Sequence, residues 1–117
     1  MALALKDTKG HFSVLVTSDI IGFTAEFADS ISNEITKKTG LERFQILLNS
    51  SHTHTGPALQ LDATKIDFPE DQKTATVQFT RSLRDKLVEL VEQSLRDFQP
   101  AKLSWGTGVA PFCHESP

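Results

Sequence analysis

The chain has 117 residues, of which 38% are hydrophobic and 23% are charged, and its formal net charge at pH 7 is −3. This length accommodates one compact domain, and the composition is typical of a globular protein rather than of a disordered or membrane-embedded chain. The absence of a Lys/Arg cluster excludes nucleic acid as a main partner, and the single cysteine, Cys113, excludes both an internal disulfide and a zinc site of several thiolates.

Targeting signals are absent from the printed sequence. The longest apolar stretches fall far short of the roughly 20 residues that cross a bilayer. The opening residues meet Lys6 and Asp7 after too few apolar positions to form a signal peptide core. The sequence as it stands therefore predicts no transmembrane segment and a cytoplasmic location.

The first part of the chain predicts two strands and a helix. Residues 3–6 and 12–18 have strand character, and residues 7–10 between them form a predicted hairpin turn. Thr24 is a suitable N-cap for the helix that follows, and Gly40 is placed to end it. This helix carries one apolar stripe at a spacing of four residues, formed by Phe27, Ile31 and Ile35.

The apolar run at residues 44–49 predicts the next strand, which completes a β-α-β unit. Strands in such a unit pair in parallel through a right-handed crossover. Their carboxyl ends then lie at one edge of the sheet, so residues 19–22 should lie near residues 50–56. Ligands commonly bind at this edge of α/β sheets.

The second part of the chain predicts a long loop, a helix and a last strand. Residues 51–72 show no regular period, whereas residues 74–98 form the clearest amphipathic helix, which Pro100 ends. Residues 101–109 return to strand character, although Gly106 and Gly108 interrupt them. The apolar face of the helix is predicted to contain Leu83, Leu87, Leu90, Val91, Leu95 and Phe98.

The predicted order is thus ββαβαβ, an α/β fold with two helices and a mixed or mostly parallel sheet. Four strands and two helices make a small core for strands that are apolar on both faces. We therefore expect residues 1–110 to be an incomplete part of a larger α/β domain. Residues 111–117 are predicted to be an irregular tail.

One segment, Asn49-Ser-Ser-His-Thr-His-Thr-Gly-Pro57, suggests chemistry. In an extended backbone His52 and His54 point to the same side, and imidazoles are common metal ligands and acid–base groups. Hydroxyls of the neighbouring residues 51, 53 and 55 could fix the ring tautomers. Two interpretations stay open at this point, a metal or catalytic site and a pair of solvated loop residues.

Asp19 is the local candidate for a third metal ligand, because it follows the neighbouring strand. Two histidines and a carboxylate suit zinc or iron(II), whereas the alternative role of Asp19 is to cap the turn after its strand. His11 lies near the opposite edge of the predicted sheet and His114 lies in the tail. Neither is expected to join the site.

The segment Ser51-His-Thr-His-Thr-Gly-Pro57 resembles the neutral/alkaline non-lysosomal ceramidase family. The similarity includes the opening residues 2–7, the strand at residues 14–19 and Ile20-Ile-Gly-Phe23, and it extends to about Val109. It covers most of this chain but only the first part of the family's amidase domain. The family consists of zinc-dependent amidohydrolases that cleave the N-acyl bond of ceramide, a lipid, to give sphingosine and a fatty acid.

The resemblance implies that His52 is a zinc ligand and that His54 stabilises the oxyanion or orients the substrate. It also implies that the other ligands, a histidine, a glutamate and a tyrosine, come from farther along the chain. This sequence contains no tyrosine, and residues 111–117 do not resemble the family's continuation. We therefore expect an N-terminal portion with an incomplete zinc site and no activity alone. Complete relatives are often secreted or membrane-associated.

Two alternatives remain open. The chain could be a small non-catalytic α/β module that binds a partner through its uncovered faces. It could also be a self-contained metal-binding protein that uses Asp19, His52 and His54.

Overall fold

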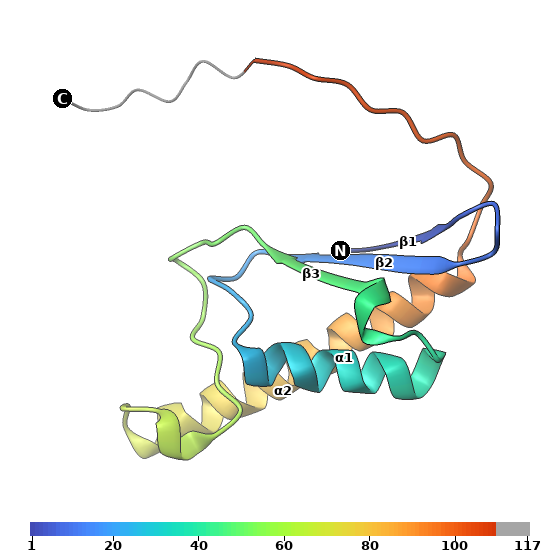
Figure 1. The fold of residues 1–117 in the computed structure, drawn as a ribbon. Helices are drawn as coiled ribbons and strands as arrows, with labels where there is room; N and C mark the ends of the chain where they lie inside the picture. The colour runs from blue at the N-terminus through green and yellow to red at the C-terminus, as the bar shows by residue number, and fades with distance from the viewer. Residues whose placement is uncertain (110–117) are drawn as a thin grey trace.

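The structure is a computed structural model that describes residues 1–109. These residues form a three-stranded mixed sheet and two α-helices, a small α/β fold (Figure 1). The sheet order is β1-β2-β3. The elements are β1 (Ala2–Lys6), β2 (Phe12–Ser18), α1 (Ala25–Thr39), the 3-10 turn η1 (Arg43–Gln45), β3 (Ile46–Ser50), the 3-10 turn η2 (Ala63–Lys65) and α2 (Glu70–Arg96).

The hairpin between β1 and β2 confirms the predicted turn. The Asp7 carboxylate accepts backbone N–H groups from Lys9 at 2.8 Å and from His11 at 2.9 Å, and Gly10 takes a φ of 94° that suits a residue without Cβ. The ring Nδ1 of His11 lies 3.0 Å from the same carboxylate. These hydrogen bonds, with the backbone N–H of His11 first, hold the pKa of Asp7 below its ordinary value.

The β2-α1-β3 unit also forms as predicted. The Thr24 Oγ1 caps α1 by accepting the Phe27 N–H at 3.3 Å, and Gly40 ends the helix with a φ of 75° and an N–H that donates to the Thr36 carbonyl. β2 and β3 pair in parallel. β3 begins at Ile46, slightly later than expected, because the preceding three residues form η1.

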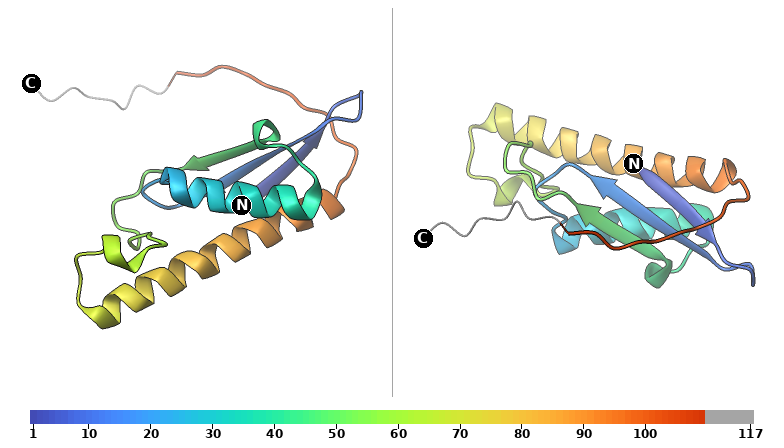
Figure 2. Two further views of the ribbon diagram at one scale, coloured as in Figure 1. Left: turned by 60° about the horizontal axis from the view of Figure 1, so that its bottom comes forward. Right: turned by 90° about the horizontal axis from the view of Figure 1, so that it is seen from above.

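Both helices lie on one face of the sheet, and the core fills the space between them (Figures 1 and 2). Its buried members come from the sheet and from both helices: Val14 and Val16 from β2, Ile31 and Ile35 from α1, and Leu87, Val88 and Val91 from α2. α2 starts at Glu70, before the predicted residue 74, and Leu90 of the expected apolar face is 37% exposed. Val88 takes the buried position instead, because α1 packs against that side of α2.

The predicted strand at residues 101–109 is wrong for this structure. The segment pairs with no strand and leaves Leu103, Trp105 and Val109 at least 83% exposed, so the order over the described residues is ββαβα. Apolar alternation makes a strand only when a partner strand is available, and Gly106 and Gly108 weaken the tendency further. The predicted tail at residues 111–117, with Cys113 and His114, lies outside the described residues.

The sheet face opposite the helices is covered by no helix among residues 1–109 (Figure 1). The register aligns Leu3 with Leu15 and Leu15 with Leu47, which makes a leucine row across all three strands. Leu3 is 46% exposed and Leu47 is 63% exposed. No helix of the described part of the chain is long and apolar enough to cross a membrane.

A pair of leucine substitutions tests this assignment of core and open face. Leu87→Ala should lower the free energy of unfolding by about 2–5 kcal/mol, because it removes a side chain buried between α2 and the sheet. Leu47→Ala changes the same side chain on the open face and should cost less than about 1 kcal/mol. Urea denaturation followed by circular dichroism measures both. Equal costs would contradict the assignment.

The Asp7 turn should make stability depend on pH. Because the pKa of Asp7 is lowered on folding, the turn's contribution is fully present above the ordinary aspartate pKa of about 3.9 and is lost as pH falls through the lower, folded value. Asp7→Asn should therefore be less stable than the wild type near neutral pH. The difference should shrink on acidification in urea titrations at successive pH values. A difference that stays constant with pH would argue against an ionised Asp7 in the turn.

Candidate functional site

The candidate site lies where β2 and β3 end. The Ser51 N–H donates to the Ser18 carbonyl at 3.2 Å, which extends the parallel ladder by one bond beyond β3. A Cβ placed on Gly56 would lie 3.7 Å from the Asp19 carbonyl oxygen. The segments after the two strands therefore lie side by side, as the β-α-β pattern predicts.

His52 has an unusual backbone conformation at this edge. Its φ is 58°, and among the described residues no other non-glycine residue has a positive φ. Such left-handed geometry costs a residue with a Cβ roughly 1–2 kcal/mol, and retained strain of this kind is concentrated at functional sites. The strain distinguishes His52 from every other non-glycine residue among residues 1–109.

The ring of His52 is oriented by a main-chain oxygen. Its Nδ1 lies 2.6 Å from the Ile21 carbonyl, and because a carbonyl can only accept, Nδ1 must carry the hydrogen. In the neutral ring this leaves a lone pair on Nε2. Metal-binding histidines are typically arranged in this way, with the second nitrogen donating to a carbonyl or carboxylate.

His54 lies beside His52. The two ring centroids are 4.9 Å apart and the rings are nearly perpendicular, at 88°. The two rings are neighbours, but His52 has a left-handed backbone in place of the extended backbone on which that expectation depended. The Thr53 and Thr55 hydroxyls bond to each other at 3.1 Å instead of to the rings.

The other predicted ligands lie elsewhere. Residues 1–109 contain no group of three His, Cys, Asp or Glu side chains placed to hold one metal ion, so Asp19 is not gathered with His52 and His54. Asp19 instead lines a hollow of about 480 Å³ beside Leu83 and Lys86 of α2. His11 is bonded to Asp7 at the hairpin, the opposite end of the sheet, as expected.

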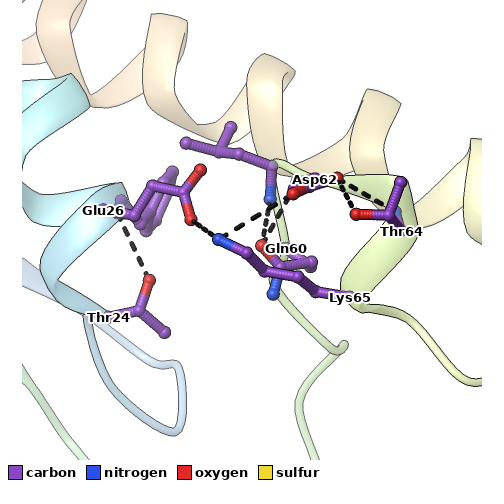
Figure 3. Close-up of polar contacts among 8 residues, drawn as sticks. Thr24, Glu26, Gln60, Asp62, Thr64 and Lys65 are labelled. Atoms are coloured by element: carbon purple, nitrogen blue, oxygen red, sulfur yellow. Dashed lines mark hydrogen bonds and ion pairs between the residues drawn. The ribbon is translucent and has the colours of Figure 1, made fainter.

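Polar contacts tie the loop after the histidines to both helices, and Figure 3 shows the contact with α1. The Gln60 N–H donates to the fully buried Thr80 Oγ1 at 3.0 Å, which anchors the loop on α2. The Lys65 ammonium reaches the Glu26 carboxylate at 2.8 Å, which anchors it on α1 and raises the pKa of Lys65. Asp62 caps η2 by accepting the Thr64 N–H at 3.0 Å. These anchors hold residues 60–65, which follow the histidine segment.

Sequence reasoning missed the Ile21 carbonyl as the group that orients His52. A main-chain oxygen has no residue-specific signature, so only the expected proximity of residues 19–22 to residues 50–56 pointed to it. The flanking hydroxyls were expected to fix the ring tautomer, but the Ile21 carbonyl does so for His52. The left-handed backbone at His52 directs its ring toward the segment after β2.

Two substitutions separate the backbone of His52 from its ring. His52→Val and His52→Asn both remove the ring bond to Ile21, but asparagine tolerates the left-handed region and β-branched valine does not. His52→Val should therefore be less stable than His52→Asn by about 1–2 kcal/mol. Urea denaturation of both variants measures the difference. Equal stabilities would show that residue 52 leaves the left-handed region at no cost.

Comparison with known proteins adds no family. No family model, no curated protein and no solved structure matches the chain.

Proposed function

We propose that this chain supplies part of the active site of a zinc-dependent amidohydrolase of the ceramidase type, which cleaves the N-acyl bond of a sphingolipid. His52 is a zinc ligand through Nε2, and His54 acts beside it. The observation that carries the proposal is the bond from His52 Nδ1 to the Ile21 carbonyl at 2.6 Å. The sequence resemblance around residues 51–57 supports the reaction class.

The histidine pair has donor chemistry that suits part of a zinc site. A catalytic zinc commonly takes three protein ligands and keeps one position for water or substrate. His52 offers a nitrogen lone pair whose direction is fixed by Ile21, and the ring of His54 lies 4.9 Å away, centroid to centroid. In the proposed enzyme the missing ligands come from polypeptide beyond residues 1–109.

The proposal assigns separate tasks to the residues present. The Ile21 carbonyl holds the Nδ1 proton of His52 and keeps its Nε2 free to bind metal. The exposed ring of His54 can hydrogen-bond the oxygen of a bound amide and orient it. Bound zinc would supply Lewis acidity and an activated water.

Zinc titration of the purified chain tests the ligand assignment. We expect measurable zinc binding that His52→Ala weakens by more than the roughly 10–100-fold caused by loss of a second-shell partner. His54→Ala should weaken binding less, and His11→Ala is the matched control because His11 lies at the hairpin. Competition with a chromogenic chelator gives the affinities.

Binding that is unchanged in His52→Ala would contradict the proposal. A loss of affinity in Asp19→Ala would instead favour the self-contained site of Asp19, His52 and His54. As a second readout, release of fatty acid from ceramide by the zinc-loaded chain should be undetectable, because the described residues hold too few ligands. Turnover that His52→Ala abolishes would refute the proposal that the remaining zinc ligands come from polypeptide beyond residues 1–109.

A further inference from the structure

The backbone of β1 bonds to β2 at every second residue. The Met1 ammonium donates to the Thr17 carbonyl at 2.8 Å, and the Thr17 N–H returns a bond to Met1 at 2.9 Å. Toward the other end of the strand, the Asp7 N–H donates to the His11 carbonyl at 3.0 Å. Because bonded and non-bonded pairs alternate in an antiparallel ladder, the odd-numbered residues of β1 face β2.

The even-numbered residues of β1 consequently direct their backbone outward. Ala2, Ala4 and Lys6 present N–H and C=O groups at the free edge of the sheet, since β1 is an outer strand. Edge strands of this kind pair readily with another extended chain. β1 lacks the proline or bulge that would block such pairing.

An apolar groove follows this edge. It has a volume of about 1030 Å³ and lies between β1, the second half of α2 and residues 99–103. Leu3, Leu5, Leu90 and Phe98 line it, and each of these side chains is more than a third exposed. The groove therefore places apolar surface directly beside unpaired backbone.

Residues 101–109 have the properties of the strand that this edge would accept. Leu103, Trp105 and Val109 share the odd-numbered face of an extended segment, with Thr107 between the last two, and are 83%, 90% and 92% exposed. Nine extended residues span about 30 Å, which exceeds the length of β1. Large apolar side chains gathered on a short exposed segment indicate an interaction site.

Residues 101–103 line the groove beside β1 of their own chain, but the hand of the connection disfavours a complete strand there. α2 ends beside the start of β2, where Phe98 and Phe12 meet at 5.7 Å between centroids, so a following strand would run parallel to β3. α1 and α2 lie on the same face, and β1 and β3 are opposite edges (Figure 2). The β2-α1-β3 connection, which leads from β2 to the β3 edge, is a right-handed crossover. If residues 101–109 paired with β1 of the same chain, the connection from β3 through α2 would run in the opposite direction on the same face. It would then be a left-handed crossover, which is rare.

The charges at the β1 edge are compatible with an antiparallel segment there. Lys102 is the one charged residue of the segment 101–109. Asp7 and Asp97 line the groove at the end where an antiparallel segment would place Lys102. The ammonium of Lys6 lies at the same end, 4.9 Å from the centroid of the Phe12 ring.

We propose that two copies of this chain exchange residues 101–109, each segment pairing antiparallel with the free edge of β1 in the other copy. The sheet of each copy then has four strands, and Leu103 and Trp105 of the partner segment fill the groove. The exchange is reciprocal, so one two-fold axis closes the dimer. This interaction is independent of the histidine pair.

The single tryptophan makes the exchange measurable. Trp105 is the only tryptophan of the chain, so its fluorescence reports on the segment alone. We expect its emission to shift to shorter wavelengths as concentration rises, in step with a monomer-to-dimer transition in analytical ultracentrifugation. Two results would overturn the proposal: emission from exposed tryptophan at every concentration, and buried tryptophan in a chain that stays monomeric, which would mean pairing within one chain.

Matched variants locate the contact. Ala4→Pro removes an outward N–H without touching the β1–β2 ladder and should abolish the dimer, whereas Ala4→Val keeps the N–H and should retain it. Leu103→Asp should also give a monomer, whereas Ser104→Asp, on the other face of the segment, should not. Leu103 is 83% exposed, so its replacement leaves the fold intact and keeps the test valid should Ala4→Pro fail to fold. A dimer that survives Leu103→Asp would exclude this interface.

Discussion

The parallel ladder between β2 and β3 holds both the core and the candidate site together. Its register pairs Val14 with Ile46 and Ser18 with Ser50, so Val14, Val16 and Ile46 face the helices together, while Leu15 and Leu47 lie on the open face. A slip of one residue would turn that apolar face to solvent, which makes the register strongly specified. The same register sets the ends of the two strands level and thereby brings the Ile21 carbonyl within reach of His52.

The histidine pair derives its geometry from this alignment. The left-handed backbone of His52 is unfavourable by itself, and the short bond to Ile21 offsets part of its cost. Anchors on Thr80 and Glu26 restrict the loop that follows. A ring held in one tautomer before a metal arrives is an advantage of preorganisation, which supports assigning His52 the metal-binding role in the proposed hydrolase.

The open side of the sheet leaves apolar surface that the described residues do not cover. A domain of about this size buries a smaller fraction of its surface than a large one, and here a leucine row, a free strand edge and an exposed tryptophan segment remain uncovered. Surfaces of this kind are stabilised by contact with further polypeptide. The proposed strand exchange would satisfy the backbone groups of β1 and cover Trp105 with one interaction.

The sequence by itself determined the features that depend on near neighbours: the Asp7 turn, the Thr24 cap, the Gly40 terminus, the parallel β-α-β unit and the edge where the histidines lie. It also identified the His52 and His54 pair as the chemically distinctive segment. Only the tertiary structure decided that Ile21 orients His52, that Asp19 lies apart, that Val88 is buried in place of Leu90, and that residues 101–109 form no strand. Caps and turns are set by atoms within four residues, whereas strand pairing, burial and ring orientation depend on partners that only the folded chain brings into contact.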